Sequence, residues 1–113
     1  MLTVDALRDF GAETGKGLER CMNNENFYFR LIRMAMADSG FDRLNAALDA
    51  GDTQAAFEAA HALKGVLGNL SLTPLSVPLS EITELLRAGT DTDYSALMNE
   101  IILQKQKLDE LAA

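Results

Sequence analysis

Apolar residues recur every three or four positions along most of this 113-residue sequence, and apolar and polar residues hardly ever alternate. The first spacing places apolar side chains along one face of an α-helix, whereas alternation would mark a half-buried β-strand. The sequence therefore predicts an all-α fold. With 48% hydrophobic residues, a chain of this length can bury a core of its own, and we expect residues 1–113 to form a single domain.

Capping residues and glycines divide the sequence into helical segments. Four long amphipathic segments joined by short connections predict an antiparallel four-helix bundle over residues 24–111. Two short helices are expected to precede it and to pack as a lid within residues 1–22: Thr3 to Phe10, ended by Gly11, and Thr14 to Met22, weakened by Gly15 and Gly17.

The first half of the bundle is expected to contain two helices. Asn24 can cap a helix whose apolar stripe continues beyond Ser39, which predicts one long helix that is kinked or broken near Gly40. Gly51 is suited to end it, and Asp52 can cap the next helix. That next helix has an apolar stripe with strict four-three spacing, which we expect to face the core: Ala56, Ala60, Leu63, Leu67 and Leu70.

The second half is expected to contain the other two helices. Pro74 suits the first turn of a helix and Gly89 its end, with an apolar series between them at Leu75, Leu79, Ile82 and Leu86. Pro78 conflicts with this interpretation, because it would lose a backbone hydrogen bond in a helix that starts at Pro74. The final helix is expected to be capped near Asp91 or Asp93 and to carry Tyr94, Leu97, Ile101, Leu108 and Leu111.

Charge and composition argue against several kinds of partner. The net charge is −7, without a run of Lys or Arg, so the chain would repel a phosphate backbone and we expect no nucleic-acid partner. No window approaches the roughly 18 apolar residues of a membrane span, and the charged start does not fit a signal peptide. We expect a cytoplasmic protein without membrane contact. Cys21, the only cysteine, is expected to pack as a small hydrophobe.

The stretch AHALKGVLGNL, residues 60–70, contains the only histidine and two glycines within a predicted helix. At about 100° per residue, Lys64 lies about 60° to one side of His61, Gly65 about 40° to the other side and Gly68 about 20° away. These four residues therefore share one face, at the flank of the core stripe. A helical glycine costs about 1 kcal/mol relative to alanine, but it bares the backbone and lets another protein surface come close.

Each of these residues also has a plain structural explanation. Gly68 could let a neighbouring helix of the same domain approach, a lone histidine is more often incidental than reactive, and a surface lysine such as Lys64 is often only a solvated charge. No acidic residue lies in the 22 positions between Glu58 and Glu81. A dianionic group on His61 would thus meet little repulsion, although a buried helix hairpin would leave the same gap.

A side chain on the following helix could orient the imidazole. If the connection is centred near Leu72, His61 and Thr83 lie equally far from its centre and at about the same height on antiparallel neighbours. Thr83 or Glu84 could then accept a hydrogen bond from Nδ1–H and leave Nε2 free as a nucleophile. Ordinary solvent exposure is the alternative role for Glu84.

These residues resemble the histidine-containing phosphotransfer (HPt) domain family. In AHALKGVLGNL, a histidine is followed three residues later by lysine, then directly by glycine, with a small residue further along the same face. The stretch GLERCMNNENFYFRLIRMAMAD is similar to the family's opening helices, and LNAALDAGDTQAAFEAAHALKG to its lead-in to the phosphorylation site. The resemblance covers most of the chain.

The resemblance implies a phosphorelay intermediate of two-component signalling. His61 would accept a phosphoryl group on Nε2 from the aspartyl phosphate of a receiver domain and pass it to another receiver. Lys64 would lie near the phosphoryl group, and Gly65 and Gly68 would make room for the partner. The implied partners are receiver domains of response regulators and a hybrid sensor kinase, and we expect a monomer.

The same resemblance implies a phosphocarrier and not an enzyme. No cofactor is expected, since the sequence has no Walker A loop or metal-ligand cluster and the receiver would contribute the metal ion. A starting methionine and a complete helix set favour a free-standing protein. Two other classes stay open: a non-catalytic helical adaptor for a signalling partner, and a phosphatase acting on a receiver, for which no residues beyond His61 offer support.

Three positions depart from the family's pattern. Ser71 stands where many members have glycine, so we expect a differently shaped helix end. Thr83 stands where Gln or Glu is common, which leaves the orienting hydrogen bond open. Pro78 is unusual at the start of its helix.

Overall fold

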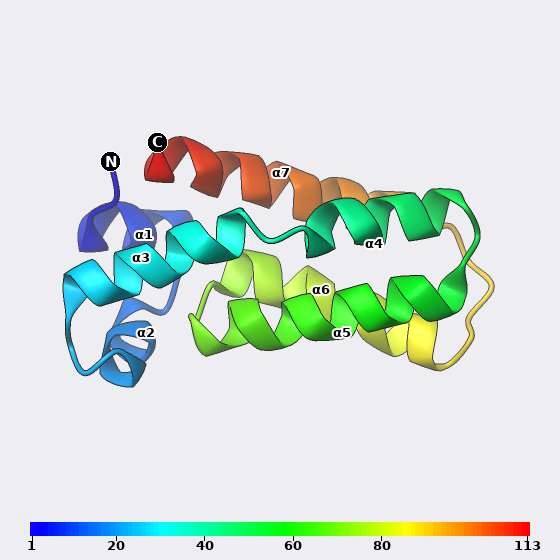
Figure 1. Cartoon of the computed structure of the whole chain (residues 1–113), viewed down its shortest axis with the longest axis horizontal. Helices are drawn as coiled ribbons and strands as arrows, with labels where there is room; N and C mark the ends of the chain where they lie inside the picture. Colours follow the sequence, from blue (N-terminus) through cyan, green and yellow to red (C-terminus); the bar gives the residue numbers. More distant parts are fainter.

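The computed structural model describes all 113 residues and contains seven helices and no strand (Figure 1). The all-α prediction is therefore confirmed. In chain order the helices are α1 (Val4–Phe10), α2 (Thr14–Arg20), α3 (Glu25–Met36), α4 (Gly40–Asp49), α5 (Thr53–Asn69), α6 (Thr73–Arg87) and α7 (Ser95–Ala112).

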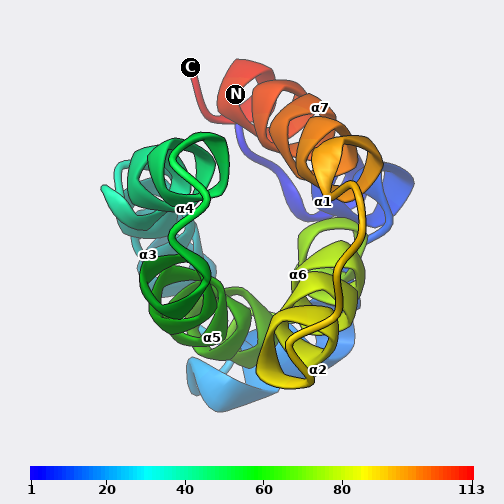
Figure 2. The ribbon, with the colours of Figure 1, turned by 90° about the vertical axis from the view of Figure 1, so that its right-hand side faces the viewer.

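Helices at four positions surround the core of the bundle, and Figure 2 shows them from one end. Helices α3 and α4 lie end to end and together occupy one of these positions, and α5, α6 and α7 occupy the other three. Helix α4 packs on α5, α5 on α6 and α6 on α7, while α3 contacts α7 and closes the ring. Buried apolar side chains form one cluster of 25 residues between these helices. The predicted antiparallel four-helix bundle is thus present.

Side-chain caps fix the starts of α3 and α5 as the sequence indicates, while at the start of α7 the N-cap residue is Tyr94 and Asp93 bonds just before it. Asn24 accepts a hydrogen bond from the Phe27 amide at the start of α3, and Asp52 accepts one from the Ala55 amide at the start of α5. Asp93 accepts the amide hydrogen of Ser95 at the start of α7. Glycines with positive φ end α1, α4 and α6, because this backbone region suits residues without a Cβ: Gly11, Gly51 and Gly89.

The break predicted near Gly40 lies between Met36 and Gly40, where α3 ends and α4 begins. Asp38 accepts a hydrogen bond of 2.7 Å from the Gly40 amide. A Cβ on Gly40 would lie only 3.0 Å from a methyl carbon of Leu63 on α5. Glycine at this position therefore allows the start of α4 to approach the helix that carries His61.

Helix α6 begins at Thr73, one residue before Pro74, and continues through Pro78 to Arg87. A proline inside a helix has no N–H for the carbonyl four residues earlier, which is why Pro78 conflicted with the predicted helix. In the structure, Pro78 is buried among the core residues of α6. The helix therefore tolerates the missing bond while the proline ring contributes to the core.

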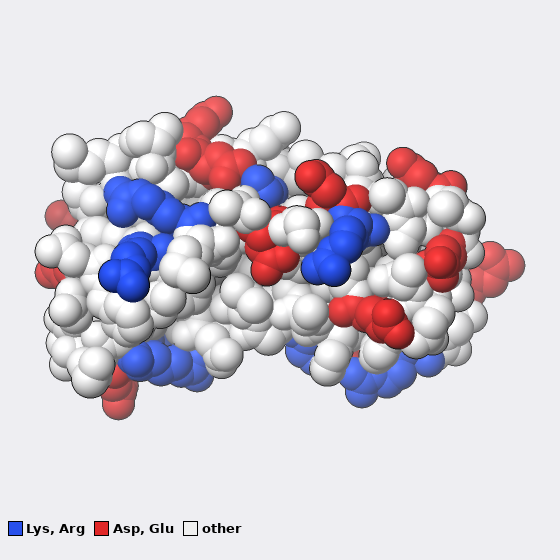
Figure 3. Space-filling view, viewed as in Figure 1, with Lys and Arg blue, Asp and Glu red and all other residues white.

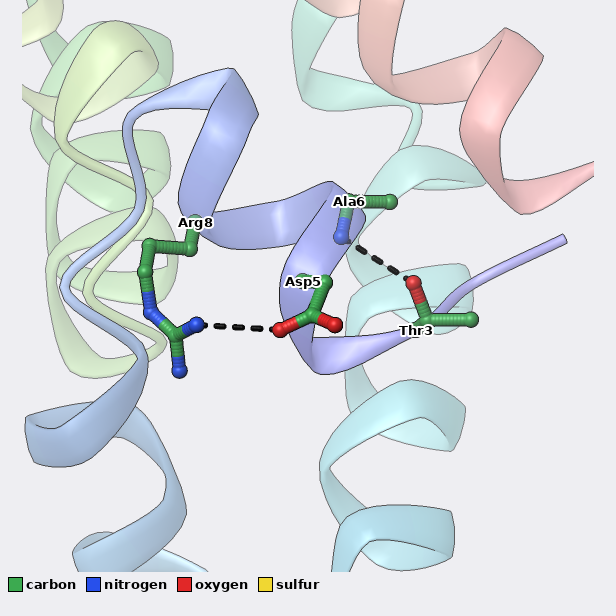
Figure 4. A network of polar contacts seen from close by, with 4 residues as sticks. All are labelled: Thr3, Asp5, Ala6 and Arg8. Carbon is green, nitrogen blue, oxygen red and sulfur yellow. Dashed lines mark hydrogen bonds and ion pairs between the residues drawn. The ribbon is translucent and has the colours of Figure 1, made fainter.

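Local polar contacts stabilise the first helix (Figure 4). Thr3 accepts a hydrogen bond of 3.0 Å from the Ala6 amide, which is the N-cap arrangement, and Arg8 pairs with Asp5 at 3.0 Å within the same helix. Helix α1 packs against α7 and α2. The second segment, predicted to extend to Met22, ends as a helix at Arg20.

The segment from Glu13 to Tyr28 is bonded to the end of α5. The Tyr28 hydroxyl donates to the Leu70 carbonyl at 2.7 Å, and the Arg20 guanidinium donates to the Gly68 carbonyl at 2.9 Å. The Glu13 amide donates to the Ser71 carbonyl at 3.0 Å. These long-range bonds occupy carbonyls at the end of a helix, where no partner within the helix is available.

No helix of this protein is both long and apolar enough to cross a membrane.

Candidate functional site

Helix α5 presents a buried stripe and an exposed face, as its spacing predicts. Ala56, Ala60, Leu63 and Leu67 of the predicted stripe are buried within the helix, and Leu70 is buried just after it. His61 is exposed beside this stripe, in the middle of the helix. The imidazole is therefore held on a rigid element and is open to solvent.

The His61 ring stacks on the ring of Phe57, one helical turn earlier. The ring centroids are 5.7 Å apart and the planes differ by 10°. Residues four apart lie on the same face of a helix, so the geometry of α5 itself brings the two rings together. Phe57 is not among the residues expected at this site from the sequence, although its spacing of four residues from the histidine is a signal for the contact.

Gly65 and Gly68 open the surface beyond the imidazole. A Cβ on either residue would meet no neighbouring atom within 4 Å. A side chain at Gly68 would therefore have no neighbour to pack against, which argues against the internal-packing explanation for that residue. The Gly68 carbonyl instead receives the Arg20 guanidinium.

Lys64 and Arg87 share one carboxylate. The Lys64 ammonium lies 3.8 Å from Oε1 of Glu84, and the Arg87 guanidinium lies 3.7 Å from the same oxygen. Glu84 and Arg87 come from α6, so this helix contributes charges of both signs beside α5. All three side chains are partly or well exposed, and exposed pairs of this kind contribute little to stability.

Arg87 also contacts the aromatic ring next to the histidine. Its Cζ atom lies 5.4 Å from the centroid of the Phe57 ring, which is within cation–π range. Arg87 was not among the residues predicted from sequence, because only the packing of α6 on α5 brings it to Phe57.

The structure does not bring Thr83 to His61. Thr83 is fully buried, and its hydroxyl donates a hydrogen bond of 2.6 Å to the Leu79 carbonyl on its own helix. Neither Thr83 nor Glu84 forms the predicted hydrogen bond with the imidazole, since Glu84 pairs with Lys64 and Arg87. Thr83 and His61 lie equally far along the sequence from Leu72, in the connection between α5 and α6, but this does not bring their side chains together. Thr83 lies on the core side of α6, whereas His61 is exposed.

The side-chain types at the site suit an anion better than a cation. No three His, Cys, Asp or Glu side chains lie close enough together to hold a metal ion. Cys21 is buried in the core, as predicted. Figure 3 shows acidic and basic side chains mixed over the face on which α3, α4 and α5 lie. Lys64 is the only charged residue of α5 after Glu58, so an anionic group on the imidazole would have a positive neighbour one turn away.

An exposed imidazole on a bare helical face can act as a nucleophile toward an electrophile that another protein presents. Apart from the stacked Phe57 ring on one face, the imidazole is exposed to solvent. The arrangement fits group transfer between macromolecules.

The family model of the Hpt domain matches residues 32–113. The matched range begins within α3 and contains α4 to α7 with His61, Lys64 and Gly65. Comparison with curated proteins and comparison with solved structures found no match. Because the matched region covers most of the chain and the whole helix that carries His61, this protein belongs to the Hpt domain family.

Proposed function

We propose that this protein is a phosphorelay intermediate that takes a phosphoryl group from one receiver domain and gives it to another. Hpt domains are phosphocarriers in histidine phosphotransfer. The observation that carries the proposal is the position of His61. It is the only histidine of the chain, it lies within the region that matches the family, and its ring is exposed on a bare helical face.

The transfer is a displacement at phosphorus. Nε2 of His61 attacks the phosphorus of an aspartyl phosphate on the donor receiver. A P–N bond forms while the P–O bond breaks, and the electron pair leaves with the aspartate, which becomes a carboxylate. The acceptor receiver reverses these steps, since its aspartate attacks the phosphorus and the imidazole leaves. This chain supplies the nucleophile and one positive neighbour, Lys64.

Gly65 and Gly68 are proposed to give the receiver access to the imidazole. Neither would place a Cβ against any other part of this chain, so the space beside them is open to a partner. A receiver surface could therefore contact the backbone of α5 directly. We further propose that the protein works as a monomer in the cytoplasm with receiver domains and a hybrid sensor kinase as partners.

The test is phosphotransfer from a labelled, phosphorylated receiver. The wild-type protein should acquire label that is stable to alkali and lost in acid, as expected for a phosphoramidate on histidine. His61→Gln should acquire none while keeping the helical circular dichroism and thermal stability of the wild type. Failure of the wild type to accept label from every cognate receiver would contradict the proposal. Receiver binding without any transfer would instead indicate the helical adaptor.

Lys64→Ala tests the role of the positive neighbour. We expect slower transfer or a shorter phosphohistidine lifetime, because a nearby ammonium stabilises the charge on the phosphoryl group. The free energy of unfolding should change by less than about 0.5 kcal/mol, since the pair with Glu84 is exposed. Lys16→Ala is a suitable control, because it removes a lysine of α2 from a surface ion pair with Glu13. A change in stability alone would make Lys64 a packing residue.

A further inference from the structure

We propose that Phe57 is a positioning residue for His61, and that Arg87 acts through Phe57 to hold it in place. This inference rests on the proposed phosphotransfer function. It identifies which groups set the direction of the reactive ring, because the hydrogen bond expected from α6 is absent.

The Phe57 ring lies stacked against the imidazole. His61 is exposed, and the polar groups of Thr83 and Glu84 on α6 bond to Leu79, Lys64 and Arg87 and not to its ring. A centroid distance of 5.7 Å with planes 10° apart is within the range of offset stacking between aromatic rings. A stacked neighbour covers one face of the imidazole and leaves its edge free. The nitrogens lie on that edge, so Phe57 can restrict the ring without blocking Nε2.

Phe57 is itself held from the other helix. It is half-buried and packs against the core, and the Arg87 guanidinium lies 5.4 Å from its ring centroid. Arg87 is in turn paired with Glu84 at 3.7 Å. The contacts thus run from Glu84 through Arg87 and Phe57 to His61. Helix α6 therefore affects the imidazole indirectly. Its Arg87 contacts the Phe57 ring of α5, and this ring in turn stacks on His61.

This contact matters because transfer depends on the direction of the ring. Nε2 must approach the phosphorus in line with the bond that breaks, and an imidazole that rotates freely spends little time in that direction. An exposed histidine without a hydrogen bond would have several rotamers available. Stacking on Phe57 removes part of this freedom before the receiver binds.

Ring-current shifts test the stacking directly. Since His61 is the only histidine, its two carbon-bound ring protons give the only imidazole signals in an NMR spectrum. We expect these signals to be displaced by the Phe57 ring in the wild type and in Phe57→Tyr, which keeps an aromatic ring. They should move to the positions of an unstacked histidine in Phe57→Leu. Unchanged signals in Phe57→Leu would overturn the proposal, whatever the outcome of any transfer assay.

Transfer kinetics separate positioning from docking. At saturating phosphorylated receiver, Phe57→Leu should transfer about tenfold more slowly than the wild type, and the half-saturating receiver concentration should stay the same. Phe57→Tyr should restore the rate. Phe10→Leu is the matched control, because Phe10 is also a half-buried phenylalanine at the edge of the core but belongs to α1.

Arg87 is tested by a double-mutant cycle. Arg87→Gln alone should slow transfer about threefold, and adding it to Phe57→Leu should cause no further loss, because Arg87 acts through Phe57. Additive losses would overturn this part and make Arg87 an independent contributor.

Two other outcomes would overturn the role of Phe57. A raised half-saturating concentration at an unchanged maximal rate would make Phe57 a docking residue, and an equal loss in Phe10→Leu would make its effect structural. If the wild type accepted no label, the proposed function would fail, and the NMR experiment alone would decide whether Phe57 positions the ring.

Discussion

Gly17 and Gly65 are both helical glycines, yet their surroundings are opposite. A Cβ on Gly17 would collide with the Tyr28 hydroxyl, whereas a Cβ on Gly65 would meet nothing within 4 Å. The sequence places both in helices but cannot distinguish them, because the Tyr28 side chain that fills the space beside Gly17 comes from another helix. The same limit applies to the imidazole. Helical spacing predicted its exposed face, but the orientation of Thr83 toward the core and the contact of Arg87 with Phe57 depend on how α6 packs.

Substitutions at these glycines should have opposite effects on stability. Gly65→Ala should raise the free energy of unfolding by about 1 kcal/mol, because alanine is the better helix former and the site is open. Gly17→Ala should lower it, because the added methyl displaces Tyr28 from its hydrogen bond with Leu70. Urea denaturation of both variants checks this difference. A loss of stability in Gly65→Ala would show that the face around Gly65 is not free.

Gly65→Leu tests the same face with a partner present. The bulky side chain should raise the half-saturating concentration of the phosphorylated receiver while the bundle stays folded, since the residue contributes nothing to the core. Val66→Leu, at an exposed position next to it, is a control for added bulk. If Gly65→Leu left transfer unchanged, Gly65 would not belong to the receiver interface.

Ser71 shows how a departure from the family's pattern is accommodated. It has a φ of +57° and is buried, so it takes the left-handed conformation for which glycine is favoured. Ser71→Gly should therefore raise the free energy of unfolding by about 0.5–1 kcal/mol. Asn23→Gly, at an exposed residue that also has positive φ, provides a comparison in chemical denaturation. A lower stability for Ser71→Gly would show that the serine side chain compensates for the strain.

At the scale of helices, the start and end of most elements follow from local sequence. Asn24 and Asp52 cap their helices, and Gly51 and Gly89 end theirs, because these effects need only neighbouring residues. The contacts that anchor the end of α5 did not follow from the sequence. They join Tyr28 and other residues of the N-terminal segment to carbonyls more than 40 positions away, and no local pattern marks such a pairing.

The anchor at Tyr28 predicts a loss of stability in alkali. Burial, with the neighbouring Cys21 as a smaller contribution, raises the pKa of the Tyr28 hydroxyl to about 12. The unfolded chain releases this proton near its usual pKa of about 10, so stability is complete below that pH and falls as the pH rises toward 12, by about 2 kcal/mol. Urea denaturation at a series of pH values measures the slope.

Two variants isolate this contribution. Tyr28→Phe should be less stable near neutral pH, because the Leu70 carbonyl loses its partner, and should lack this part of the alkaline slope. Tyr94→Phe removes the other tyrosine hydroxyl, which is only partly buried, and should keep the slope. An unchanged slope in Tyr28→Phe would assign the alkaline loss to other groups.

At the scale of the whole molecule, the family match begins at residue 32, but hydrogen bonds join residues before this position to the end of α5. The N-terminal segment supplies core residues such as Leu7 and Cys21 and bonds to α5. We propose that residues 1–113 unfold as one domain. Resonances of His61 and of the Tyr28 ring should then report the same transition midpoint in urea. A lower midpoint for Tyr28 would show that the part of the chain before residue 32 unfolds separately from α5.

The open face of α5 has a consequence for how such a protein can change over evolutionary time. Gln54, Ala62 and Asn69 are exposed on this helix, and Gly65 packs against nothing, while the residues that hold the bundle together lie on the opposite side. Mutations on the exposed face can therefore accumulate with little selective penalty from misfolding. The choice of signalling partner can diverge among descendants of this chain while the scaffold beneath it is inherited unaltered.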